Sequence, residues 1–279
     1  MPKYSSHRQE EYIKKKHKRR RIKVIIFFVL FFLSIGFLIW IAHRPSLRIS
    51  EVELSGGVLV TQQEVSTEVI QFISGSYIWV FPKNNALLYP QKKLEKYLKD
   101  HFKRIDTIHV DTKNLHTMSV EISERKSEAL WCGGVPGETE GEQGQCYFMD
   151  ANSTIFAEAP QFSGDAYFKY YGLVTTDSPI GLEYMATSTD FAELSNFVQN
   201  ARRLQIKPEY VVAKDTGEFT LVLAGGGKIY FDNKEPLTKV ADNLEALLRT
   251  PALVPSTNAD LPIDYIDLRF GNKLFYKLK

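Results

Sequence analysis

The sequence predicts an α+β protein with one N-terminal transmembrane helix, a first domain of element order β-α-α-β-β, and a mixed β-rich second domain with flanking helices. Three observations predict this fold: a charge-free apolar run over 24–42, two amphipathic helical stretches and an alternating hairpin within 47–124, and short strands separated by turn residues over 125–279. The 279 residues are 44% hydrophobic and 24% charged, which is typical of a folded chain. Two Cys and 17 Gly exclude a disulfide framework or a collagen-like chain.

The apolar run over 24–42 predicts a membrane-spanning helix. Its nineteen residues carry no charge, and at ~1.5 Å per residue they cover about 28 Å, close to the hydrocarbon thickness of a bilayer. Residues 1–23 hold ten Lys or Arg against two Glu, whereas His43 and Arg44 are the basic residues directly after the run. The positive-inside rule therefore predicts a cytoplasmic basic tail over 1–23 and a body outside the cytoplasm, as in a single-pass type II protein of the inner (plasma) membrane.

A signal peptide or a nucleic-acid-binding tail could also begin in this way. A cleaved signal peptide has a shorter apolar core, and Trp40 stands where a small residue is wanted before a cut after Ala42. The basic run over 14–23 could bind nucleic acid through phosphate. Beside a membrane span, its expected role is to set orientation and to contact anionic lipid, so no nucleic-acid partner is expected.

The first domain is expected over residues 47–124. A strand begins at Leu47, and Thr61 with Glu64 forms a capping-box pattern that starts a helix. Pro90 stands at the start of a second helix, and a hairpin with clean alternation follows over 105–122. A three-stranded sheet with both helices on one face buries the two amphipathic surfaces. The aromatic run over 77–81 is expected in the core, with a partner-binding surface as the alternative.

The second domain is expected over residues 125–279. Hairpin strands are predicted over 147–149 and 154–156, a helix over 189–205, a three-stranded meander over 210–231, and a further helix that closes before Pro251. The chain then ends in two strands.

A cysteine pair lies near the start of this second domain. Cys132 and Cys146 bracket a Gly- and Glu-rich segment that is typical of a mobile loop. A disulfide is favoured outside the cytoplasm. Two free thiols are the alternative. A zinc site is not favoured, because no further ligands lie nearby in the sequence.

Two segments carry a family resemblance. The strand end and the segment after it contain Val120, Ile122, Glu124, Arg125, Ala129 and Trp131, and the chain closes with YIDLRFGNKLFYKLK. With a membrane anchor and a β-α-α-β-β domain in this order, the chain resembles the FtsQ/DivIB family of bacterial division proteins. The resemblance implies that 47–124 form a POTRA domain and 125–279 an FtsQ/DivIB-type domain.

The sequence offers no pattern that favours catalysis. All six His lie at or before His116, so the second domain cannot build a Ser-His-Asp site from its own side chains. Gly225–Lys228 lacks the remainder of a phosphate loop, and Ser123–Lys126 matches Ser-x-x-Lys without the Lys-Thr-Gly that accompanies it in penicillin-binding enzymes. We therefore expect no enzyme activity, cofactor, metal or small-molecule substrate.

The last strand is the candidate binding site. A strand at the chain end can lie at a sheet edge and accept a strand from another protein, whereas its lysines could equally serve to prevent pairing. The resemblance favours binding, because the FtsQ-like family receives its FtsB/DivIC-like partner in this region and works with FtsL-like proteins at the division septum. The candidate residues are Arg269, Phe270, Asn272, Leu274, Phe275, Tyr276 and Leu278.

Two functions compete with the divisome scaffold that the resemblance implies. A POTRA-containing component of a secretion or envelope-assembly machine is the first, although a long β-barrel pattern is missing from the sequence. A cell-wall enzyme is the second.

Overall fold

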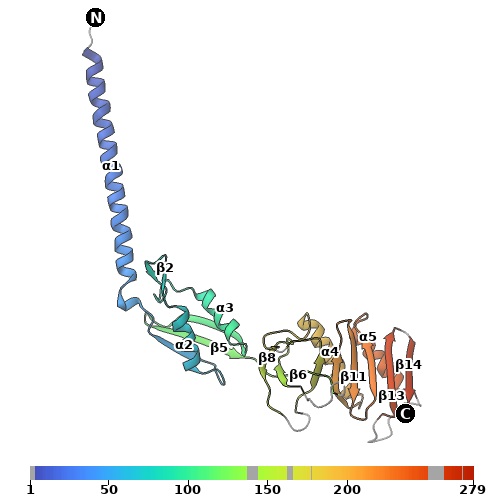
Figure 1. Cartoon of the computed structure of the whole chain (residues 1–279). Coiled ribbons are helices and arrows are strands. Elements are labelled where there is room, and N and C mark those ends of the chain that lie inside the picture. The colour runs from blue at the N-terminus through green and yellow to red at the C-terminus, as the bar shows by residue number, and fades with distance from the viewer. Residues whose placement is uncertain (1–3, 137–143, 162–165, 177, 251–260, 272) are drawn as a thin grey trace. The chain divides into compact units, whose positions relative to one another are not determined.

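The computed structural model describes residues 4–136, 144–161, 166–176, 178–250, 261–271 and 273–279 (Figure 1). The described chain forms two compact units. The first comprises Met1–Phe102 and Thr107–Ser123, and the second comprises Lys103–Asp106 and Glu124–Lys279. Apart from the short segment Lys103–Asp106, the division falls between Ser123 and Glu124.

Helix α1 (Tyr4–Ala42) opens the first unit. Within it, Lys16–Ala42 is long and apolar enough to cross a membrane, and its large apolar side chains are exposed rather than packed in a protein core. This is compatible with a single-pass membrane protein. The helix begins well before the predicted residue 24, because the Lys, Arg, Gln and Glu residues of the basic tail are good helix formers.

The remainder of the first unit has the predicted order of two helices and three main strands, with one small extra hairpin. Its main sheet has the order β1-β5-β4, with β1 parallel to β5. The elements are β1 (Glu51–Ser55), α2 (Gln62–Phe72), β2 (Ser76–Tyr77), β3 (Phe81–Pro82), α3 (Gln91–His101), β4 (Ile105–Thr112) and β5 (Thr117–Glu124).

Local sequence signals explain how α2 and α3 form and pack. The predicted capping box is present, because Thr61 Oγ1 accepts from Glu64 N and Glu64 Oε2 accepts from Thr61 N at 2.9 Å. Helix α3 begins one residue after Pro90. The two helices bury apolar side chains at helical spacing, and β4 and β5 bury apolar side chains too. These core residues are Val65, Val69, Leu94, Leu98, Val110 and Val120.

The aromatic run over 77–81 departs from expectation. It forms the β2–β3 hairpin, in which Tyr77 pairs with Phe81. At the turn, Ile78 is 83% exposed and Trp79 is 97% exposed. The prediction that this run lies in the core is therefore wrong for Ile78 and Trp79, because they lie in a tight turn at the surface.

The second unit is a nine-stranded mixed sheet with two helices. The strand order is β14-β13-β12-β11-β10-β9-β6-β7-β8. The elements are β6 (Ala129–Cys132), β7 (Cys146–Met149), β8 (Ile155–Glu158), β9 (Lys169–Gly172), α4 (Ser188–Arg203), β10 (Pro208–Ala213), β11 (Glu218–Leu223), β12 (Lys228–Asp232), α5 (Leu237–Leu248), β13 (Ile263–Phe270) and β14 (Lys273–Leu278).

The two helices belong to crossover connections. β9 and β10 are parallel and are joined through α4, whereas β12 and β13 are parallel and are joined through α5. Parallel neighbours need such a crossover, and its usual handedness puts the connecting helix against the sheet. Side chains of both helices, such as Phe197 and Leu244, belong to one core cluster with sheet residues such as Phe231 and Ile266.

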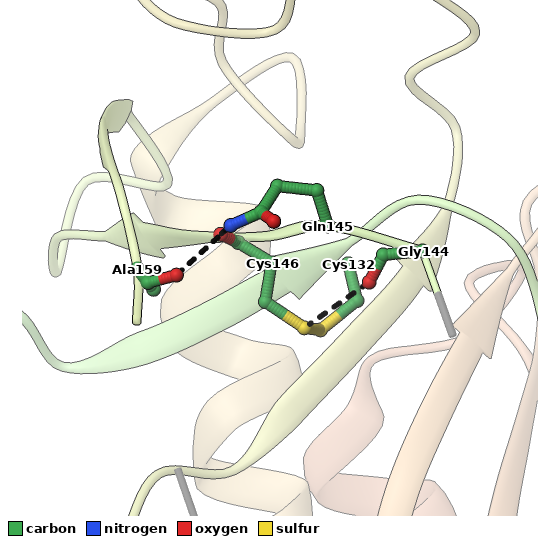
Figure 2. Close-up of a disulfide and its surroundings, with 5 residues drawn as sticks. All are labelled: Cys132, Gly144, Gln145, Cys146 and Ala159. Atoms are coloured by element: carbon green, nitrogen blue, oxygen red, sulfur yellow. Dashed lines mark hydrogen bonds between the residues drawn. A yellow bond between two sulfur atoms is a disulfide. The ribbon is translucent and has the colours of Figure 1, made fainter. Parts of the chain in front are cut away.

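The cysteines form the disulfide that the sequence favours (Figure 2). Cys132 and Cys146 stand directly opposite each other in the antiparallel pair β6–β7. Beside them, Gln145 Nε2 donates to Ala159 O at 2.9 Å. The bond thus closes the base of the predicted loop, whose residues 137–143 lie outside the described part of the chain.

Candidate partner-binding edge

Strand β14 forms one end of the large sheet (Figure 1). It pairs with β13 in antiparallel register, with Ile266 opposite Tyr276 and Asp267 opposite Phe275. Within the described residues, no strand pairs with its other side. The prediction that the last strand lies at a sheet edge is therefore confirmed.

The opposite end of the sheet differs from β14. There, the segment around Leu182 pairs with the start of β8: Ile155 N donates to Leu182 O at 2.9 Å, Gly181 N donates to Ile155 O at 2.6 Å, and Thr154 bridges Glu183. An added strand would have to displace this segment, because the peptide N and O of Ile155 already have partners. The two ends of this sheet thus offer different opportunities for binding.

Register shows how the β14 side chains divide between the two faces. Leu274 is partly buried and packs against the core cluster that includes α4 and α5. Tyr276 and Leu278 stand opposite the buried residues Ile266 and Ile263. The predicted common direction of Leu274, Tyr276 and Leu278 agrees with this register, and Leu274 has a structural role in addition.

Four apolar side chains at this edge remain exposed to solvent. Phe275 is 50% exposed and Tyr276 is 42% exposed, and the rings of Phe270 and Phe275 meet edge to face with centroids 5.3 Å apart. We call Phe270, Phe275, Tyr276 and Leu278 the edge patch. Apolar residues beside an unpaired strand edge can fill pockets or grooves of an added strand or helix.

Arg269 lies in an intramolecular network. Its Nη2 donates to Asp267 Oδ2 at 2.6 Å, its Nη1 donates to Glu218 Oε1 at 3.2 Å, and its guanidinium lies 5.4 Å from the centroid of the Tyr230 ring. Burial alone would raise the pKa of Asp267, but hydrogen bonds from the side chain and backbone of Arg269 together lower that pKa below its ordinary value. The hydrogen bond to Asp267 raises the pKa of Arg269. This network stabilises the conformation of β13, the strand next to the edge strand β14.

Two of the edge lysines are also engaged within the sheet. Lys277 Nζ lies 2.8 Å from Asp264 Oδ2, and Lys279 Nζ donates to Gly225 O. The hydrogen bond from Lys277 lowers the pKa of Asp264, and it raises the pKa of Lys277. Lysines tied to their own sheet project less charge toward an incoming strand, which weakens the interpretation that they serve to block pairing.

The hairpin brings together most of the predicted binding residues. Arg269 and Phe270 lie on β13, and Leu274, Phe275, Tyr276 and Leu278 lie on β14, whereas Asn272 lies outside the described residues. The contribution of Glu218 and Tyr230 to this region was not predicted. They lie on β11 and β12, and no short-range signal links them to Arg269.

Other parts of the described chain provide little that resembles a reactive site. No group of three or more His, Cys, Asp or Glu in the described residues could hold a metal ion. A cavity of about 220 Å³ lies beside α4 and includes Tyr170 and Arg202 in its lining. Burial raises the pKa of Tyr170 to about 12, so its hydroxyl is neutral at pH 7 and is a poor nucleophile there.

Comparison with known proteins gives no assignment: no family model matches the sequence, and no curated protein matches it. A functional proposal therefore depends on the geometry of the edge, on the apolar helix and on the sequence resemblance described above.

Proposed function

We propose that this protein is a non-catalytic scaffold of the bacterial division machinery, anchored by α1 and binding partners at the β14 edge. An FtsB/DivIC-like protein adds a strand to β14, and the assembly links an FtsL-like protein at the septum. The observation that carries the proposal is an edge strand, β14, that pairs with β13 on one side and with no strand of the described sheet on the other, flanked by the edge patch.

The geometry of β14 supports strand addition. Main-chain N–H and C=O groups along an edge give affinity without regard to sequence, and side chains at alternate positions give selectivity. Phe275 on one face and Tyr276 on the other can contact both sides of an added strand. At the other end of the sheet the segment around Leu182 already occupies the start of β8, so we assign binding to the β14 end.

The anchor supports the orientation that the scaffold requires. Basic residues precede the apolar part of α1, and positive charge is retained on the cytoplasmic side of a span. In this orientation residues 43–279 lie outside the cytoplasm, where the Cys132–Cys146 disulfide is also favoured. The protein is then a single-pass type II membrane protein with a cytoplasmic N-terminus.

Localisation in dividing cells tests the function. A fluorescent protein fused to the N-terminus is expected to concentrate at mid-cell during septation in the native bacterium. Uniform membrane fluorescence, together with co-purification of transport proteins, would contradict the division role. That outcome would favour a POTRA-containing component of a secretion or envelope-assembly machine.

A further inference from the structure

The β2–β3 hairpin places two large apolar side chains in solvent. Tyr77 and Phe81 pair at its base, and Val80 N donates to Tyr77 O at 3.0 Å to close the turn. The two central residues are Ile78 and Trp79, which we call the hairpin tip; their exposed fractions are 83% and 97%. Such exposure of a Trp next to an Ile suggests a surface that is covered in the native setting.

The backbone conformation of the tip also indicates a binding surface. Ile78 has φ 47° and Trp79 has φ 65°. A β-turn with positive φ at both central residues ordinarily contains Asn-Gly or a similar pair, and a β-branched residue in this region is an outlier. A sequence suited to the turn alone would not place Ile and Trp here. Strain of this kind is commonly retained where it serves binding.

The hairpin is tied to the end of the apolar helix. Buried Asn85, three residues after β3, donates from Nδ2 to Ala42 O at 3.0 Å, and its Oδ1 accepts from Leu87 N at 2.9 Å. Ala86 N donates to Leu47 O at 2.8 Å. Strand β3 also packs against α1 within this unit. These contacts hold the hairpin beside the point at which the chain leaves the apolar segment.

Residues around this point have the chemistry of a membrane interface. The Arg44 guanidinium lies 3.7 Å from the centroid of the Trp40 ring at the end of α1, and Lys83 Nζ lies 5.9 Å from the Tyr77 ring. Trp, Tyr and basic side chains concentrate where the hydrocarbon meets the headgroups. A lipid surface fits both the apolar tip and the cations near it.

We propose that Ile78 and Trp79 insert into the interfacial layer of the leaflet from which residue 43 emerges. The hairpin then gives the first unit a second membrane contact, which restrains its rotation about the end of α1. The inference requires that α1 spans a membrane, and it does not depend on a role in cell division.

The test uses the full chain with its disulfide intact, reconstituted in vesicles of phosphatidylcholine and phosphatidylglycerol. Single thiols are introduced by Ile78→Cys, Val58→Cys or Leu33→Cys and labelled with an environment-sensitive fluorophore. Both native cysteines are bonded to each other, so the label goes to the introduced thiol. Val58, 85% exposed and beyond the far end of β1, is the matched control for Ile78.

We expect label at position 78 to emit at shorter wavelength than label at 58, to be quenched by lipid spin-labelled near the headgroup, and to be shielded from aqueous iodide. Trp79→Glu should abolish these differences. Equal iodide quenching at 78 and 58, with quenching at 33 by lipid spin-labelled near the end of its acyl chain retained, would overturn the hairpin contact alone. Loss of lipid quenching at 33 as well would overturn the membrane span, and the hairpin contact with it.

Discussion

The rings of Phe270 and Phe275 meet edge to face at 5.3 Å across the last turn of the chain. Both are about half exposed, and they belong to the two strands that form the end of the large sheet. An aromatic pair contributes beyond its buried area, and aromatic side chains are frequent anchors of protein interfaces. We therefore regard this pair as the apolar centre of the edge at which we propose that a partner binds.

Replacement of Phe275 by Asp is expected to weaken binding of the FtsB/DivIC-like partner by about 2 kcal/mol, roughly thirtyfold in Kd, because it puts a charge at an apolar anchor. Folding should lose only about 1 kcal/mol, because the substitution removes the contact with the Phe270 ring but the side chain is half exposed. Calorimetric titration of the full chain in nanodiscs measures the affinity.

Leu182→Asp is the control, because Leu182 is a comparably exposed apolar residue at the opposite end of the same sheet, beside β8. It should leave the affinity unchanged. An equal loss for both variants would argue against a specific role of β14.

Leu274→Asp should instead unfold the second unit more readily. Leu274 packs against the core cluster of the sheet, and a charge there costs about 2–4 kcal/mol through lost burial and desolvation. A lower thermal midpoint, compared with that of Tyr276→Asp, measures the difference. Matching midpoints for the two variants would show that Leu274 is not a core residue.

Removal of the disulfide is expected to lower the stability of the second unit by about 3 kcal/mol, as the chain-entropy model gives for a loop of about 15 residues. The two cysteines are 14 positions apart. Denaturant unfolding of the full chain with and without reductant measures the loss. Identical midpoints would mean that the bond does not form or adds nothing to stability.

Arg125 donates to the carboxylate of Asp150, and both side chains are nearly buried. Asp150 Oδ1 also accepts from the backbone N of Asn152 and of Thr154, which form the β7–β8 turn. Arg125→Met leaves this carboxylate buried without its cation, which costs about 3–5 kcal/mol.

A double variant separates the destabilisation caused by the unpaired buried charge from that caused by lost packing of the Arg125 side chain. Arg125→Met combined with Asp150→Asn should recover part of the stability, as followed by denaturant unfolding. No recovery would assign the effect to the Arg125 side-chain packing.

Protonation of Asp267 should lower the free energy of unfolding of the second unit at acidic pH. Its pKa in the folded chain is below the ordinary value, so its contribution is fully present above about pH 4 and is lost as the pH drops through the lower, folded pKa. Asp267→Asn should make stability less dependent on pH in that range. Denaturant unfolding at a series of pH values from neutral to acidic measures the stability of the original chain and of the Asp267→Asn variant. The same dependence of stability on pH in both would contradict the assignment to Asp267.

Local patterns in the sequence predicted most of the elements. The Thr61–Glu64 box marks the start of α2, and the apolar spacing of α5 and the position of β14 at the edge also agree with expectation. The cap and the apolar spacing depend on residues close together in the chain. Helix caps and periodicity act over one or two turns, so short-range reasoning captures them.

Long-range and strained features escaped prediction. β9 has four residues and lies between β6 and β10, and its place in the sheet depends on pairing with distant strands. Arg269 reaches Glu218, 51 positions away. The positive φ of Ile78 and Trp79 contradicts the usual preference of these residue types, so the exposed tip could not be read from the sequence.

The most direct test of the binding edge is photo-crosslinking in dividing cells of the native bacterium. A photoreactive amino acid replaces Phe275 in the full chain, and a second strain carries it at Leu182. The account predicts a covalent adduct between position 275 and a small FtsB/DivIC-like protein, identified by mass spectrometry, and no such adduct from position 182. The absence of that adduct at 275, or the same adduct at both positions, would contradict the account.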